Sequence, residues 1–183
     1  MSFNKILISQ TAPSNLAAYT ALEEKYGVKI DFYPFFKIEP LTSKEFRTQR
    51  INLADYTAVV FSSRATIDSY FKLCEEARFK VPETMKYFCT SELVAMYLQK
   101  HIVFRKRKIF FGSTGKVADM LPQMVKHKNE KYLVPMSDVH NDDIKKLLDS
   151  KNLKHTECVM YRTVSNDFTE EEIKNFDYDM LVF

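Results

Sequence analysis

VVFSSRATI, residues 59–67, is an apolar run that stops at two serines and then resumes as a segment suited to a helix. Valine and phenylalanine favour strands, and serine is a preferred residue at the N-terminus of a helix. Ile67, Tyr70, Phe71 and Cys74 follow at spacings that place them on one helical face. The stretch therefore predicts a strand, a turn and a helix in direct succession.

The same succession recurs along the chain. Further strands are predicted at 5–8, 86–89, 109–111, 132–136 and 155–164, and all but the last are followed by a polar turn and a helical pattern. Strands that alternate with helices at this spacing pair in parallel through right-handed crossovers. We therefore expect an α/β fold built on doubly wound parallel sheets.

The pattern is interrupted once, early in the chain. Gly27 ends the first predicted helix, residues 28–36 predict a second strand, and Pro40-Leu41-Thr42-Ser43 follows as a break. We expect a domain linker at 37–41.

Hydroxyl side chains occupy the predicted turns. In doubly wound sheets these turns line one edge, where ligands bind, and helix N-termini there favour anions. The residues concerned are Ser9, Thr11, Ser62, Ser63, Thr90, Ser91, Ser113, Thr114 and Ser137. They predict an edge that receives an anion, although helix capping alone also explains a Ser or Thr at any one turn.

The composition is that of an ordinary globular protein. Of the 183 residues 45% are hydrophobic and 28% charged, and the net charge is +3 from 27 basic and 24 acidic residues. This balance does not indicate a nucleic-acid-binding protein, but it admits an anionic ligand. The basic run 105–108 leads straight into a predicted strand, so we interpret it as a solvated strand edge and expect no nucleic-acid partner.

The cysteines and the hydropathy of the chain indicate its cellular compartment. Cys74, Cys89 and Cys158 are far apart, form no C-x-x-C pair and have apolar neighbours, which predicts reduced, buried thiols and a cytoplasmic location. No apolar run approaches the roughly 20 residues that a membrane span needs, so we expect no membrane association.

Motifs for cofactors and metals are weak. The segment GSTGK at 112–116 is too short for a phosphate-binding loop, and Val117 stands where a Ser or Thr would follow the lysine. The histidines show no metal-ligand spacing, and His140 with the polar residues after it is interpreted as a solvated helix start. We expect neither a metal nor a cofactor.

Four short motifs follow an N-terminal strand in a fixed order along the chain. They are KILIS at 5–9, FSSRATI at 61–67, YFCTS at 87–91, LVPMS at 133–137 and VMYRT at 159–163. No single motif is specific, but together they span nearly the whole chain. In this order the chain resembles the uroporphyrinogen-III synthase family, in particular the form found in Bacteroides-like bacteria.

The resemblance implies two doubly wound parallel-sheet domains joined by a two-stranded linker, with the first domain discontinuous. Residues 1–38 are then the N-terminal part of the first domain, 42–163 the second domain, and 167–183 the start of the return. Most of the returning half is expected to be absent, so the chain is expected to be C-terminally truncated. An edge strand left uncovered favours pairing, and we expect a dimer through it.

The resemblance also implies an activity that needs no cofactor. The family cyclises hydroxymethylbilane, a linear tetrapyrrole, to uroporphyrinogen III in heme biosynthesis, with loss of water and inversion of ring D; this is a lyase reaction. A truncated chain is expected to be inactive. Tyr161 is the expected proton donor to the departing hydroxyl, and Arg64 with the turn hydroxyls would hold the acetate and propionate groups. Glu92 stands where many members have a threonine, so that contact is not carried over.

Two interpretations from other classes remain open at this point. One is a non-enzymatic, two-lobed α/β module that binds a small anion between its lobes, which explains the turn hydroxyls equally well. The other is a flavodoxin-like domain with a flavin at the sheet edge, which the absorbance of the purified protein would reveal.

Overall fold

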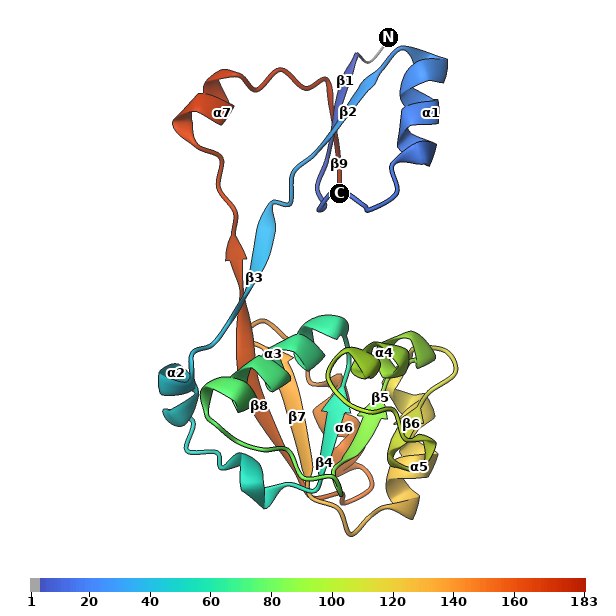
Figure 1. The fold of residues 1–183 in the computed structure, drawn as a ribbon, viewed down its shortest axis with the longest axis vertical. Helices are drawn as coiled ribbons and strands as arrows, with labels where there is room; N and C mark the ends of the chain where they lie inside the picture. The colour runs from blue at the N-terminus through green and yellow to red at the C-terminus, as the bar shows by residue number, and fades with distance from the viewer. Residues whose placement is uncertain (1–3) are drawn as a thin grey trace. The chain divides into compact units, whose positions relative to one another are not determined.

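The computed structural model describes residues 4–183, and the chain divides into two compact units (Figure 1). One unit contains the residues up to Lys37 together with 164–183, and the other contains 38–163. Each unit has its own sheet, with the strand order β2-β1-β9 in the first and β3-β8-β7-β4-β5-β6 in the second. Every strand pair whose register is established is parallel, which confirms the predicted α/β class.

The first unit holds a three-stranded sheet. Strands β1 (Lys5–Ile8), β2 (Lys29–Phe32) and β9 (Met180–Val182) form it, accompanied by helices α1 (Ala17–Tyr26) and α7 (Glu170–Lys174). The single strand predicted at 28–36 is wrong, because β2 ends at Phe32 and β3 (Phe36–Pro40) begins only after Pro34. Proline has no N–H to donate and restricts the backbone of the residue before it. A break between β2 and β3 at Pro34 therefore follows from the sequence.

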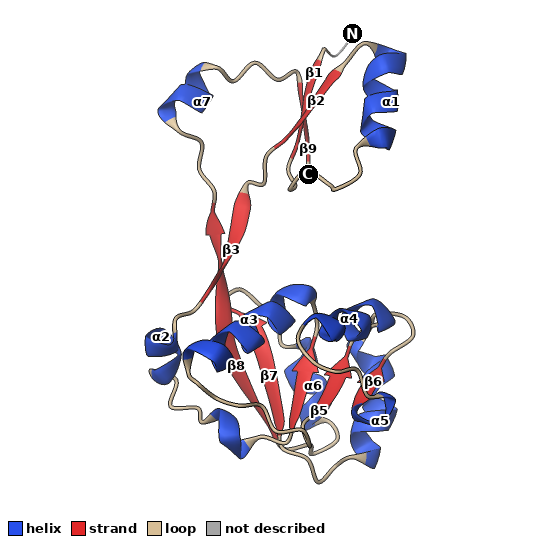
Figure 2. Ribbon diagram, in the orientation of Figure 1, coloured by secondary structure: helices blue, strands red, loops and turns tan. Residues whose placement is uncertain are grey.

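The second unit contains the repeated strand and helix units. Its strands are β4 (Ala58–Phe61), β5 (Lys86–Cys89), β6 (Ile109–Phe111), β7 (Tyr132–Ser137) and β8 (His155–Ser165), adjoined by β3. Its helices are α2 (Ser43–Arg47), α3 (Arg64–Glu76), α4 (Glu92–Tyr97), α5 (Leu121–Lys126) and α6 (Asp143–Asp149), as Figure 2 shows.

Strand β4 is buried on both faces and divides the core in two. Val59 and Phe61 belong to a cluster with the buried residues of α3 and α4. Ala58 and Val60 belong to the opposite cluster, which includes Met124 of α5 and others from α6. Helices therefore cover both faces of the sheet, which is what an unbroken apolar strand requires.

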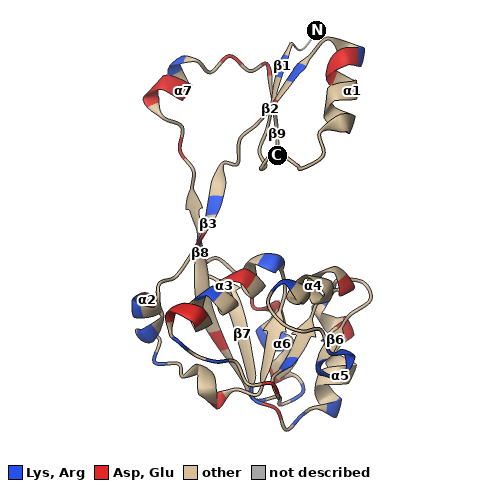
Figure 3. Cartoon of the chain, viewed as in Figure 1, with Lys and Arg blue, Asp and Glu red and all other residues tan. Residues whose placement is uncertain are grey.

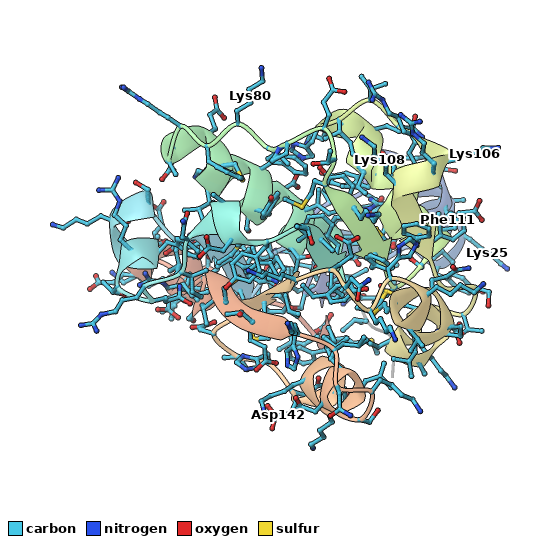
Figure 4. The ribbon with its side chains drawn as sticks, turned by 90° about the horizontal axis from the view of Figure 1, so that it is seen from below. Lys25, Lys80, Lys106, Lys108, Phe111 and Asp142 are labelled. Carbon is cyan, nitrogen blue, oxygen red and sulfur yellow. The ribbon has the colours of Figure 1, made fainter. Side chains whose placement is uncertain are left out.

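Charged residues lie around this core. Basic and acidic positions are interspersed over the helices and loops of each unit (Figure 3). The basic run 105–108 precedes β6, which is the outermost strand of its sheet, and Lys106 lies at the periphery in Figure 4. Residues 105–107 are exposed, as expected, but Lys106–Lys108 form a 3₁₀ turn just before β6 and are not part of the strand. Within residues 4–183, each helix is too short or too polar to cross a lipid bilayer.

We predict that Val59→Ala lowers the free energy of unfolding of the second unit by about 2 kcal/mol, because each buried methylene contributes about 0.8 kcal/mol and a cavity remains. Val59 is fully buried, whereas Val103 is 78% exposed and serves as the matched control. Urea unfolding of Val103→Ala is expected to stay within about 0.5 kcal/mol of the wild type. Equal effects of the two substitutions would contradict the assigned core.

Candidate active site

A cavity of about 600 Å³ opens at the carboxyl ends of the strands in the second unit. Ser62 follows β4, Thr90 follows β5, Ser137 ends β7, and Tyr161 lies on β8 beside Ser137. These four lining residues were predicted from the sequence. The rest of the lining is Gly115, Val117, Pro135, Met136, Val139, His140, Asn141, Asp143 and Ile144. Parallel pairing brings all these segments to one edge, as is general for ligand sites in such sheets.

Ser63 and Ser91 are helix caps, as predicted. The Ser63 hydroxyl accepts from the Thr66 N–H at 3.2 Å, and Thr66 in turn completes a capping box at the start of α3. The Ser91 hydroxyl accepts from the Val94 N–H at 3.3 Å at the start of α4. Because both hydroxyls serve the backbone, their local role is to hold the helices that follow β4 and β5.

Ser113 and Thr114 do not cap a helix, so that prediction is wrong. Both hydroxyls lie against the carboxylate of Asp119, with Thr114 donating from its N–H at 2.8 Å and from its hydroxyl at 2.6 Å. These bonds lower the pKa of Asp119. The turn leads into a 3₁₀ segment, Val117–Met120, whose start has no side-chain cap. The Ser113 and Thr114 hydroxyls already bind the Asp119 carboxylate, and its negative charge disfavours the binding of an anionic ligand at this turn.

Ser9 and Thr11 belong to the first unit and do not cap a helix either. The Ser9 N–H donates to the carbonyl of Val182 at 2.7 Å, and Thr11 is exposed. Helix α1 begins only at Ala17, with Leu16 at the cap position and no side-chain hydrogen bond there. The prediction of helix caps at this turn is wrong because the loop after β1 is too long for its hydroxyls to reach the helix.

Ser137 also does not cap the helix that follows it, because α6 begins six residues later after Asp142. The Ser137 hydroxyl donates instead to the Asp138 carboxylate at 2.9 Å. The same carboxylate oxygen accepts from the N–H groups of Val139 at 3.0 Å and Thr163 at 3.1 Å. These bonds lower the pKa of Asp138, the Thr163 N–H having the largest effect.

A bulge positions Tyr161. Met136 pairs with Val159 but Ser137 pairs with Tyr161, so Met160 is the extra residue on β8. The Asp138 N–H donates to the Tyr161 carbonyl at 3.1 Å, and the Asp138 carboxylate accepts from the N–H of Thr163. The loop after β7 is therefore bound to β8 at Tyr161 and at Thr163, two residues further along. Bulges commonly redirect a side chain at a functional site.

The Tyr161 side chain is half-buried. It packs against the core cluster of α3 and α4 and lines the cavity. Its hydroxyl makes no hydrogen bond to any side chain or backbone group within residues 4–183. A phenol in this position is free to donate to a ligand.

Arg64 is the first residue of α3 and is exposed. Its guanidinium carbon lies 5.3 Å from the centre of the Tyr97 ring, a distance at which a cation is attracted by the aromatic face. The Tyr97 hydroxyl donates to Asp68 at 2.8 Å. Arg64 therefore stands near the start of the helix that Ser63 caps, outside the cavity lining.

His140, Asn141 and Asp143 also line the cavity, although no sequence pattern predicts them there. They lie in the loop between β7 and α6 or at the start of α6. Their polar sequence predicts a solvated helix start, and residues 140–143 are indeed exposed. Only the return of this loop over the sheet edge brings them to the cavity, and no local pattern signals it.

Comparison with known proteins decides the family. The family model described as uroporphyrinogen-III synthase HemD matches residues 17–183. The chain belongs to this family. Membership supports a function in tetrapyrrole biosynthesis and implies an enzyme. No curated protein sequence matches the chain significantly.

Solved structures agree with the family in fold. A mutant uroporphyrinogen III synthase from the extremely thermophilic bacterium Thermus thermophilus has a TM-score of 0.61 and 13% identity, with 97% of this chain and 71% of that chain covered. The uroporphyrinogen-III synthetase from Helicobacter pylori 26695 has a TM-score of 0.59 and 14% identity, with 98% and 72% covered. At such identities the likeness concerns the fold alone.

We predict that Asp138→Asn destabilises the protein at neutral pH and that the difference from the wild type disappears in acid. The pKa of Asp138 lies below the ordinary value of about 3.9, so its stabilising effect is present above that pH and is lost as the pH falls through the folded value. Urea unfolding between pH 7 and about pH 2.5 measures this dependence.

Asp142→Asn is the matched control, because the Asp142 side chain makes no cap bond at the start of α6. Its free energy of unfolding is expected to follow that of the wild type at each pH. A difference between Asp138→Asn and the wild type that is independent of pH would contradict the role of the charged carboxylate.

Proposed function

We propose that the chain is a uroporphyrinogen-III synthase that cyclises hydroxymethylbilane to uroporphyrinogen III, with inversion of ring D and loss of water. The observation that carries this proposal is Tyr161, a lining residue of the cavity whose hydroxyl has no hydrogen-bond partner in residues 4–183. The volume of about 600 Å³ lies within the range of small-molecule sites. In this proposal the reaction is that of a lyase, uses no cofactor and takes place in the cytoplasm, which three buried, free cysteines favour.

Hydroxyl groups on the lining supply donors for the acetate and propionate groups of the substrate. The Ser62 side chain is exposed and lines the cavity. The Thr90 hydroxyl donates to the Ser62 carbonyl at 3.1 Å, and the Ser137 hydroxyl is committed to Asp138. Ser62 is therefore the lining hydroxyl best placed to donate to a carboxylate, with Thr90 and Ser137 shaping the wall around it.

The chemistry begins when the substrate hydroxyl leaves. Donation from Tyr161 lets it depart as water and leaves an azafulvene cation on ring A. Ring D then attacks through its substituted carbon, and the spiro intermediate collapses with ring D inverted. The enzyme's main contribution is to hold the two ends of a flexible chain together in the correct order, which is catalysis by proximity and orientation.

We predict that Tyr161→Phe lowers kcat by about 10²-fold or more, because the proton donor is removed while the ring is kept. Hydroxymethylbilane is generated in place, and the products are oxidised and separated into type I and type III uroporphyrin. Tyr26→Phe is the matched control, since Tyr26 is 62% exposed on α1.

Type III product from the wild type and from Tyr26→Phe, with a large loss in Tyr161→Phe, supports the proposal. Equal turnover by all three proteins would remove Tyr161 from the mechanism. Type I product alone from the wild type, together with saturable binding of uroporphyrinogen III, would favour the non-enzymatic binding module.

A further inference from the structure

His140 has one ring nitrogen held and the other free. It lies between β7 and α6 and lines the cavity that Tyr161 also lines. Its Nδ1 is 2.8 Å from the carbonyl oxygen of Ser137. A carbonyl only accepts, so Nδ1 carries the hydrogen, and in the neutral ring the lone pair is on Nε2. Nε2 has no hydrogen-bond partner within residues 4–183.

The other histidines are engaged elsewhere. His101 binds Asp68 at 2.8 Å and stacks on Phe71. His127 packs against Phe88 and Phe110. His155 also has its Nδ1 bound to a carbonyl, that of Leu153 at 2.9 Å, but its Nε2 lies 3.8 Å from the Asp149 carboxylate, and it stands at the start of β8, away from the cavity. Of the four histidines, only His140 lines the cavity.

The proposed reaction needs a proton acceptor as well as a donor. One proton enters when the C–O bond breaks and water leaves. Two C–C bonds form and one breaks as ring D inverts, and the ring carbon that began with a hydrogen then loses it as a proton to restore the pyrrole. Proton uptake and release therefore balance, but they occur at different atoms and at opposite ends of the reaction.

We infer that His140 is a second catalytic residue, and that its Nε2 accepts the proton released from ring D in the last step. This inference rests on the proposed function. The bond from Nδ1 to Ser137 selects the tautomer that can accept and holds the ring against the end of β7, close in the sheet to Tyr161. Tyr161 and His140 then divide the two proton transfers between them.

Other titratable groups near His140 are less suited to this role. Asp138 is in the same loop, but its carboxylate accepts three hydrogen bonds from protein groups. Asp142 lies at the periphery beside α6 in Figure 4. Asp143 lines the cavity with Tyr161 and is the remaining charged neighbour, so Asp143→Asn belongs in the test.

The decisive variant is His140→Asn. Asparagine places an N–H donor where Nδ1 stands, so it can keep the bond to the Ser137 carbonyl, but it provides no base. We expect kcat to fall by about 10²-fold with little change in KM. We also expect the acid limb of the pH profile, the decrease of kcat at low pH, to flatten in this variant. Added imidazole is expected to restore part of the activity of His140→Ala. His155→Asn is the matched control and is expected to retain wild-type kcat and the acid limb.

Wild-type kcat in His140→Asn would overturn the inference and would show that the Nδ1 bond serves the loop alone. A loss of the fall in kcat at low pH in Asp143→Asn but not in His140→Asn would also overturn it.

If the wild type forms no type III product, the proposed function fails by itself. Histidine ring ¹⁵N resonances are then recorded as uroporphyrinogen III is added: movement of the His140 signal alone supports contact with the tetrapyrrole, and a stationary His140 signal overturns the inference.

Discussion

Parallel pairing of β4 with β5 on one side and β7 on the other is the constraint on which the second unit depends. Because strands in such a sheet run the same way, the residues that follow each strand meet at one edge. Ser62, Thr90 and Ser137 are distant in sequence but line one cavity for this reason. The two buried faces of β4 differ in size, and a shift of its register by one residue would move the Phe61 ring into the core that now holds Ala58 and Val60.

Strand β8 brings the proposed proton donor to this edge. The bulge opposite Met136 and Ser137 brings Tyr161 level with the end of β7. Asp138 connects the loop to β8 through its N–H and its carboxylate. The same loop carries His140, whose ring is bound to the Ser137 carbonyl. One short segment thus sets the position of the proposed donor and of the proposed acceptor.

The sequence predicted those features that depend on local patterns. The strand at 58–61, the capped helix after it and the cap at Ser91 follow from residue preferences. The expected caps at Ser113 and Ser137 are wrong because their hydroxyls bind the carboxylates of Asp119 and Asp138, and the one at Ser9 is wrong because α1 begins only at Ala17. The bulge at Tyr161 and the return of His140 over the sheet edge depend on register and on loop path, which no local spacing encodes.

The claim that the tetrapyrrole binds at the carboxyl ends of the strands is tested most directly by adding uroporphyrinogen III to ¹⁵N-labelled protein and following the backbone amides. The chain offers an internal comparison, because a second cavity, of about 200 Å³ and lined by Val81, Met85, Tyr87 and Ile109 among others, lies at the starts of β5 and β6. We predict that the amides of Ser62, Thr90, Ser137 and Tyr161 shift, while those around the smaller cavity do not. Shifts confined to the smaller cavity, or none at either, would contradict the proposed site.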